Sequence, residues 1–165
     1  MTSWNLDACG KGRKTSRMSE FKVNIEWTRE TPDFKVETYS RQHRIQFNGG
    51  VAIQSSAPAE FAGDAKLPNP EELLASALGS CFMLTVLAVS ARGGFTVDKY
   101  EDHPVALLEK NANGKMAVTQ VTLRPKVTYS GTSPDPAKLS EIFSKAHANC
   151  MIANSVSAKV VVQPA

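Results

Sequence analysis

Two cysteines lie in parts of the chain that are expected to fold, and their thiols are the groups best suited to carry out a reaction. Cys81 lies within the apolar stretch Leu73–Val89, and Cys150 follows a segment with helical spacing. A thiol in an apolar segment is most often an inert core residue, because cysteine behaves as a small hydrophobe. Two thiols can also form a redox pair, in which the second sulfur condenses with the oxidised first one. The residues alone leave both interpretations open.

The segment 1–17, MTSWNLDACGKGRKTSR, is predicted to be a disordered leader that carries the whole net charge of +3. The rest of the chain is then neutral overall, which predicts no basic face and no nucleic-acid partner. The leader has no apolar core of the kind that secretory signals need, so a reducing, cytoplasmic location is expected. Cys9 is interpreted as an incidental leader residue. No membrane segment is expected, because polar residues interrupt the longest apolar run, Leu73–Val89.

A long central helix is the strongest structural prediction. Asn69 is a good N-cap, Pro70 suits the first helical position, and Glu72 completes a capping-box pattern. The helix is expected to run to about residue 91 and to end at the glycine pair 93–94. Its apolar residues cover most of its circumference, which predicts burial nearly all round.

The remaining segments alternate apolar and polar residues or carry helix signals, which predicts an α+β fold in a single domain over 18–165. One-face apolar spacing predicts a second helix over Ala137–Asn149, with one further turn in 151–157. The turn signal at residues 113–114 indicates a hairpin. Strands are expected at Phe21–Trp27, Phe34–Phe47, within 51–68, at Phe95–Lys110 with a break at Pro104, at Met116–Tyr129 and at Lys159–Gln163.

Two motifs resemble those of the OsmC/Ohr family of thiol peroxidases: NPEELLASALGSCF at 69–82 and AHANCMIANSV at 146–156. The resemblance covers roughly residues 18–163 and implies an intertwined α+β homodimer with a long central helix buried between antiparallel sheets. It implies reduction of organic, and also inorganic, hydroperoxides without a metal or flavin cofactor. The partners it implies are a second copy, the hydroperoxide substrate and an external thiol reductant, such as a lipoyl-type dithiol.

The resemblance also implies roles for both cysteines: Cys81 is the attacking thiol and Cys150 the resolving one. The sequence departs from the family at Met151, where many members have proline. The family's helper arginine has no obvious local motif here, and Arg41 is the candidate, while His43 is interpreted as structural. These departures leave a second hypothesis open, a non-catalytic protein on the same fold that binds a small hydrophobe or senses redox state.

Peroxide reduction needs a thiolate, and an apolar helix disfavours one, so a nearby cation is required. Arg41 meets that need, and Glu71 can orient its guanidinium through paired hydrogen bonds. Glu71 and Cys81 are ten residues apart, which on one helix is about 15 Å along the axis and roughly 80° around it. The two cannot serve one small site within one helix, so Glu71 is expected to come from the partner subunit.

Overall fold

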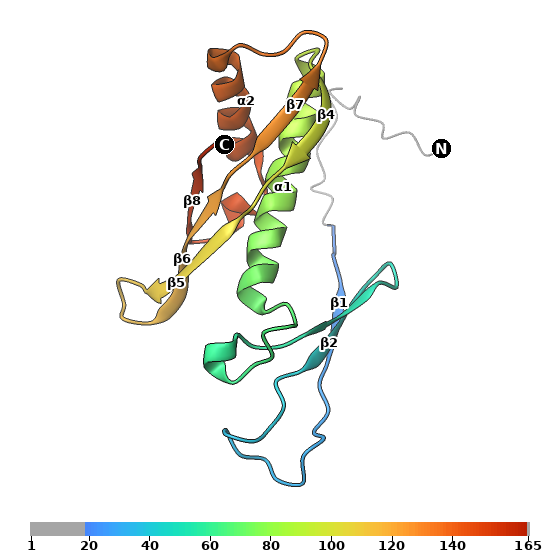
Figure 1. Ribbon diagram of the computed structural model, residues 1–165, viewed down its shortest axis with the longest axis vertical. Coiled ribbons are helices and arrows are strands. Elements are labelled where there is room, and N and C mark those ends of the chain that lie inside the picture. The colour runs from blue at the N-terminus through green and yellow to red at the C-terminus, as the bar shows by residue number, and fades with distance from the viewer. Residues whose placement is uncertain (1–18, 165) are drawn as a thin grey trace, which may run out of the picture.

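The computed structural model describes residues 19–164 and shows a mixed α+β fold built around one long helix (Figure 1). The predicted leader lies outside the described residues, and so does Cys9. The helices are α1 (Pro70–Arg92) and α2 (Pro136–Asn149), and short 3-10 turns occur at Ala59–Phe61 and Ala153–Ser155. The strands are β1 (Val23–Glu26), β2 (His43–Phe47), β3 (Ala52–Ser55), β4 (Thr96–Glu101), β5 (Val105–Lys110), β6 (Met116–Leu123), β7 (Lys126–Ser130) and β8 (Lys159–Val162). The predicted α+β class is confirmed.

The start of α1 is held by the capping box that the sequence predicts. The Asn69 side chain accepts the Glu72 amide at 2.9 Å, and the Glu72 carboxylate accepts the Asn69 amide at 3.0 Å. Because Pro70 has no amide, three amides at the start of the helix lack an intrahelical partner, and the capping box satisfies two of them. The helix ends at Gly93, whose own amide donates back into the last turn.

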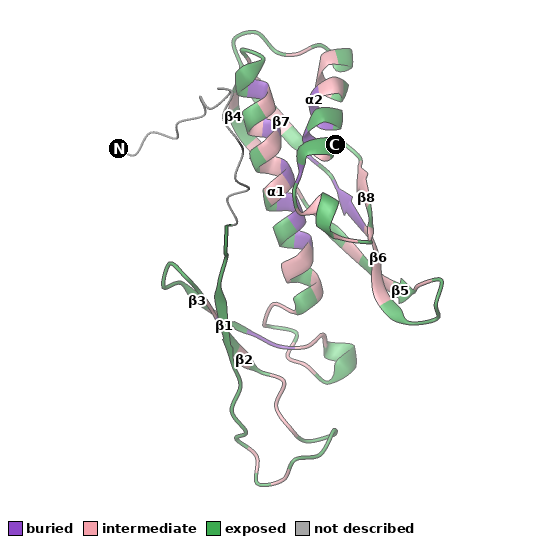
Figure 2. Ribbon diagram, turned by 180° about the vertical axis from the view of Figure 1, so that it is seen from behind, coloured by how far each residue is buried: buried purple, intermediate pink, exposed green. Residues whose placement is uncertain are grey.

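Only one stripe of α1 is buried within the single chain. Ala75, Leu78, Phe82 and Val86 recur at intervals of three and four residues and form a core with α2 and β6 (Figure 2). Elsewhere on α1, Leu84 is 60 % exposed. The prediction of burial nearly all round is therefore wrong for one chain alone, because the other elements of the chain cover only one side of the helix.

By length and composition, α1 would also be able to cross a membrane, with a mean hydropathy of 2.0 over its most apolar 18-residue window. The prediction that polar residues make this apolar run too short to span a membrane is wrong, because single serines and threonines lower its mean hydropathy only slightly. In this fold the helix packs against α2 and the strands β4, β5 and β6. The core helix of a soluble protein meets the same criterion, and one stripe of α1 is buried in the core.

The strands after α1 form a long hairpin that two prolines interrupt. β4 pairs with β7, and β5 pairs with β6, both antiparallel, while β8 joins the far side of β6 in parallel. Pro104 separates β4 from β5 as predicted. The predicted single strand Met116–Tyr129 is wrong, because Pro125 lacks the amide that a ladder needs and divides it into β6 and β7. At this break Asp102 accepts the Arg124 amide at 2.6 Å.

The N-terminal strands β1, β2 and β3 form a separate antiparallel sheet beyond the N-terminal end of α1 (Figure 1). The predicted strand Phe34–Phe47 is confirmed only from His43 onwards. Residues 34–42 instead form a turn closed by the Tyr39 amide on the Lys35 carbonyl at 3.0 Å. The rings of Trp27, Phe34 and Tyr39 cluster there with centroids 5.2–6.2 Å apart, so the aromatic residues that suggested a strand stabilise a folded loop.

Gly79 is the point of closest approach between α1 and the break at Pro104. A Cβ built on Gly79 would lie 2.7 Å from Cγ of Pro104, whose ring has little freedom to move away. We expect Gly79→Ala to destabilise the protein by roughly 1–3 kcal/mol, as overpacked core substitutions do. Chemical denaturation measures this. Ser80→Ala, at the next and exposed position, is the matched control and is expected to change stability by less than about 0.5 kcal/mol. An equally stable Gly79→Ala protein would contradict this packing.

Candidate active site

The structure brings the two cysteines together from different helices. Cys81 lies in the middle of α1 and is partly exposed, whereas Cys150 caps the end of α2 and is fully buried. Both are free thiols, and Cys81 lies close enough to Cys150 to raise the pKa of the Cys150 thiol. The contact follows from the packing of α2 on α1, where Ile142, Phe143 and Ala146 meet the buried stripe of α1.

Cys150 is held in a turn that begins at the end of α2. Its amide donates to the His147 carbonyl at 3.3 Å, and its sulfur accepts the Ala153 amide at 3.4 Å. Burial raises the pKa of the Cys150 thiol to about 11, the neighbouring Cys81 side chain adds to the rise, and the Ala153 amide opposes it. Near neutral pH Cys150 is therefore protonated.

This raised pKa makes the stability of the reduced protein depend on alkaline pH. Between the unfolded pKa of Cys150 near 9 and the folded pKa of about 11, the folded state retains a proton that the unfolded state releases. The free energy of unfolding is therefore unaffected below pH 9 and falls as the pH rises toward 11, by roughly 2–3 kcal/mol. Urea denaturation under reducing conditions measures the slope. Cys150→Ser is expected to flatten it, and an identical slope in both proteins would contradict the assignment to Cys150.

Arg41 lies at the N-terminal end of α1, far from the thiols of its own chain. Its guanidinium donates to the carbonyls of Tyr39 and Val36 and stacks 3.9 Å from the centroid of the Tyr39 ring. With Pro70, it lines an aromatic cavity of about 480 Å³. Pro70 and Cys81 are eleven residues apart on one helix, which corresponds to about 16 Å. Next to Arg41, His43 contacts the Arg41 carbonyl through Nδ1 at 2.9 Å.

Glu71 lies in the first turn of α1, at the same end of the helix as Arg41. Its Oε2 is buried and has no hydrogen-bond partner among the described residues. Buried carboxylate oxygens are normally paired, because an unsatisfied one costs more than an ordinary lost hydrogen bond. Within one chain the predicted site residues therefore lie in two separate places: the two thiols near the middle of α1, and Glu71 and Arg41 at its start.

Sequence reasoning missed the Ala153 amide as a contact of the Cys150 sulfur. A side-chain acceptor three residues before a free amide is the arrangement of a helix N-cap. The signal was present, since a turn was expected within 151–157 and the observed 3-10 turn covers Ala153–Ser155. Cysteine is not among the usual capping residues, so its sulfur was not considered as an acceptor.

The fold and the thiol pair define a class of α+β protein in which a thiol on a long core helix meets a second thiol at the end of a C-terminal helix. Residues 63–165 match the family described as OsmC-like protein, and the chain belongs to that family. It is similar to the solved structure of an OsmC-like protein of unknown function from Vibrio cholerae, with 39 % identity and a TM-score of 0.84 over 90 % of this chain and 100 % of that one.

Two further relatives have names that refer to peroxides. Peroxiredoxin OsmC of Escherichia coli is 28 % identical over 102 residues, which is 62 % of this chain and 68 % of the relative. The organic hydroperoxide resistance protein OhrB of Bacillus subtilis shares the fold, with a TM-score of 0.65 and 20 % identity over 89 % of this chain and 98 % of that one. The resemblance stated from the sequence is thus confirmed at the level of the family and its fold.

Proposed function

We propose that this protein is a cysteine-based hydroperoxide reductase in which Cys81 attacks the peroxide and Cys150 resolves the product. The observation that carries the proposal is the proximity of the two thiols, which come from different helices and pack in the same core cluster. A core packed only for stability has no need to place two thiols in contact, whereas a two-cysteine peroxidase requires it. The names of the relatives from Escherichia coli and Bacillus subtilis support the same activity.

The proposed reaction uses only the protein's own sulfurs and an external thiol. The Cys81 thiolate attacks the outer oxygen of the hydroperoxide, the O–O bond breaks, and the leaving alkoxide takes a proton and departs as an alcohol. Cys81 becomes a sulfenic acid. The Cys150 sulfur then displaces water from it and forms a disulfide. A dithiol of the lipoyl class would reduce that disulfide by exchange and itself become oxidised.

Cys150 has a defined part in the first step as well. Its raised pKa keeps it protonated near neutral pH, so it can donate a hydrogen bond to the sulfur that must carry the negative charge. It becomes a nucleophile only after Cys81 has been oxidised and no longer needs that donor. The reduction of this disulfide by external thiols is compatible with the cytoplasm, which is the location we propose.

We further propose that the working unit is a homodimer. One face of the N-terminal sheet carries apolar side chains aligned by the strand register, and three of them, Val23, Ile25 and Phe47, are 40–63 % exposed. Leu84 exposes a further apolar side chain on α1. A three-stranded sheet with an uncovered apolar face gains stability when a second copy covers it.

A dimer with antiparallel α1 helices would also join the two halves of the site. Oε2 of Glu71 lacks a hydrogen-bond partner among residues 19–164, and within that range the Arg41 guanidinium donates to two carbonyls and stacks on the Tyr39 ring. Glu71 lies ten residues before Cys81 on α1, and Arg41 lines a cavity with Pro70 at the same end of the helix. An antiparallel partner helix would therefore bring both residues toward the thiols. Arg41 of the partner would then stabilise the Cys81 thiolate, and Glu71 would orient the guanidinium.

Mass spectrometry after one equivalent of cumene hydroperoxide tests the proposed reaction. We expect the wild-type protein to lose two hydrogens and to yield a peptide cross-linked between Cys81 and Cys150. Cys150→Ser is expected to gain one oxygen at Cys81, which a sulfenic-acid trapping reagent captures. Hydrogen peroxide in parallel reports the substrate preference. Unmodified Cys81 in both proteins would refute the proposal.

A binding role on the same fold remains the second candidate, and one observation favours it. The cavity lined by Trp27, Phe34, Tyr39 and Arg41 is almost entirely apolar and, at about 480 Å³, large enough for a small hydrophobic molecule. Saturable binding of such a molecule together with inert thiols would support this role instead. Reversible oxidation of the thiols without turnover would indicate a redox sensor.

A further inference from the structure

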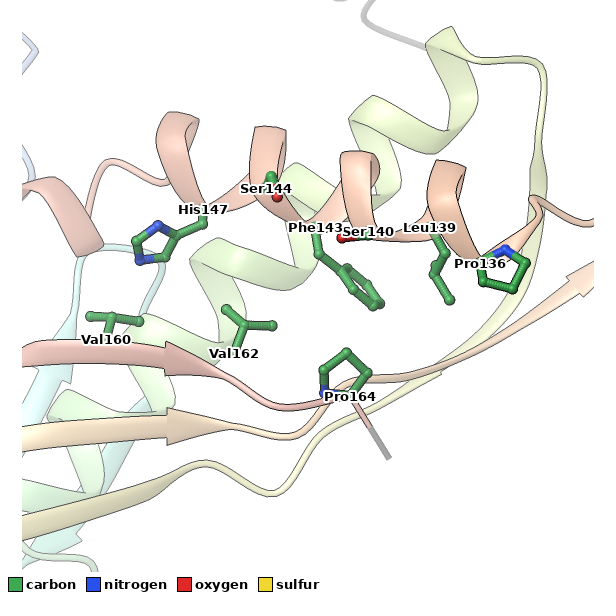
Figure 3. A pocket seen from close by; sticks show the side chains of 9 residues that line it. All are labelled: Pro136, Leu139, Ser140, Phe143, Ser144, His147, Val160, Val162 and Pro164. Carbon is green, nitrogen blue, oxygen red and sulfur yellow. The ribbon is translucent and has the colours of Figure 1, made fainter.

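A groove between α2 and β8 lies apart from both halves of the proposed site. It has a volume of about 490 Å³, which is within the range of small-molecule sites. Figure 3 shows α2 along one wall and β8 along the other. The lining residues are Pro136, Leu139, Ser140, Phe143, Ser144, His147, Val160, Val162 and Pro164.

The polar groups of the groove all come from α2. Ser140, Ser144 and His147 follow one another at intervals of four and three residues, so they share one face of the helix and span about 10 Å. Ser76 in α1 and Ser155 after α2 each donate to a carbonyl of their own turn at 2.8 Å. Within the described part of the chain, Ser140 and Ser144 make no such bond, and their hydroxyls remain available to a ligand.

The rest of the groove is apolar. Val160, Val162 and Pro164 form the β8 wall, and Leu139 and Phe143 reach across from α2 (Figure 3). Among residues 19–164, no lysine, arginine, aspartate or glutamate lines the groove. A bound ionised group would therefore lose its hydration without gaining a counter-charge, which is strongly unfavourable.

We propose that this groove is a binding site for an uncharged, elongated amphipathic molecule, such as an aliphatic alcohol. The hydrocarbon part packs against Val160, Val162 and Phe143, and a hydroxyl or carbonyl oxygen bonds to the polar row on α2. This inference goes beyond the proposed peroxidase activity and does not depend on it, since the groove contains neither thiol.

Two residues that line the groove also contact residues at or next to the thiol pair. The Phe143 ring lies 6.1 Å from the ring of Phe82, the residue after Cys81. The carbonyl of His147 accepts the amide of Cys150 at 3.3 Å. A molecule in the groove therefore contacts the same α2 residues that position the buried thiol.

The test is an NMR titration of the reduced, isotope-labelled full chain with 1-octanol in the absence of peroxide. We expect saturable shifts of the α2 and β8 amides, and at least tenfold weaker binding of octanoate, because its carboxylate finds no cation in the groove. Ser144→Phe fills the groove from an exposed position and is expected to weaken octanol binding at least tenfold. Ala148→Phe, which places the same ring elsewhere on α2, is expected to leave binding unchanged.

His147→Ala is a second variant that retains the backbone carbonyl for Cys150, and we expect it to weaken octanol binding several-fold. Circular dichroism checks that all three variants fold. Shifts that do not saturate, or that fall only around Arg41, would overturn the proposed site. Equal affinity for octanoate and octanol would overturn the ligand class. Because no peroxide is present, an inactive peroxidase would leave the result of this titration unaffected.

Discussion

Replacing Cys81 with serine is expected to lower kcat/KM for cumene hydroperoxide by roughly a thousandfold or more, since removing a nucleophile removes the reaction pathway. Serine has nearly the size of cysteine, so the packing around Phe82 and Cys150 is retained. Its hydroxyl stays protonated near neutral pH and does not attack the O–O bond. A coupled assay with dihydrolipoamide as reductant measures the loss.

Two further thiol variants separate the chemistry at Cys81 from a general effect of losing a cysteine. Cys9→Ser removes the leader thiol and is expected to retain wild-type turnover. Cys150→Ser is expected to release one equivalent of alcohol in a single turnover and then to slow, because the sulfenic acid has no internal thiol to condense with. Turnover that survives in Cys81→Ser, or that disappears in Cys9→Ser, would contradict the assignment.

Arg41→Ala is expected to lower kcat/KM by about a hundredfold, in the range found for loss of one charge-stabilising donor. A mixture of this variant with Cys81→Ser tests whether Arg41 acts across the dimer interface. After joint unfolding and refolding, half of the dimers contain one subunit of each kind. If Arg41 acts across the interface, each mixed dimer has one complete site, and activity returns to about a quarter of the wild-type value.

The same mixture also tests the alternative in which Arg41 acts on the thiols of its own chain. In that case neither site of a mixed dimer is complete, and activity stays at the average of the two inactive parents. Glu71→Gln mixed with Cys81→Ser is expected to show the same recovery, because Glu71 lies at the same end of α1 as Arg41. Sedimentation of each parent checks the assembly, and a monomer at assay concentration would refute the shared site.

Local signals in the sequence were sufficient for α1. Its capping box depends on three adjacent residues, and the hydrogen bonds of Asn69 and Glu72 appear as predicted. The strand predictions failed where the strand propensity of the residues was outweighed by their packing contacts in the fold. The aromatic residues of 34–42 favour a strand on average, but here their rings pack on Trp27 and hold a loop. Pro125 itself indicated a break, but the long alternation of apolar and polar residues over Met116–Tyr129 led to the prediction of one continuous strand.

The composition of the site depends on contacts between distant segments, so it was harder to predict from the sequence. The contact between Cys81 and Cys150 depends on how α2 packs on α1, and only the resemblance to the OsmC/Ohr family suggested it. The separation of Glu71 from Cys81, in contrast, could be predicted from the sequence, because the geometry of a single helix determines it. The unpaired Glu71 oxygen had no sequence signal at all, since it depends on which neighbours bury that side chain.

The order of the elements has a consequence for how the chain folds during synthesis. α2 and the strands β4, β5 and β6, which α1 packs against, all follow it in the chain. At 5–20 residues per second, the ribosome needs roughly 3–10 seconds to add the segment from the end of α1 to the end of α2. During that interval the most apolar helix of the protein emerges without its partners, so the nascent chain is most prone to aggregate just before α2 appears.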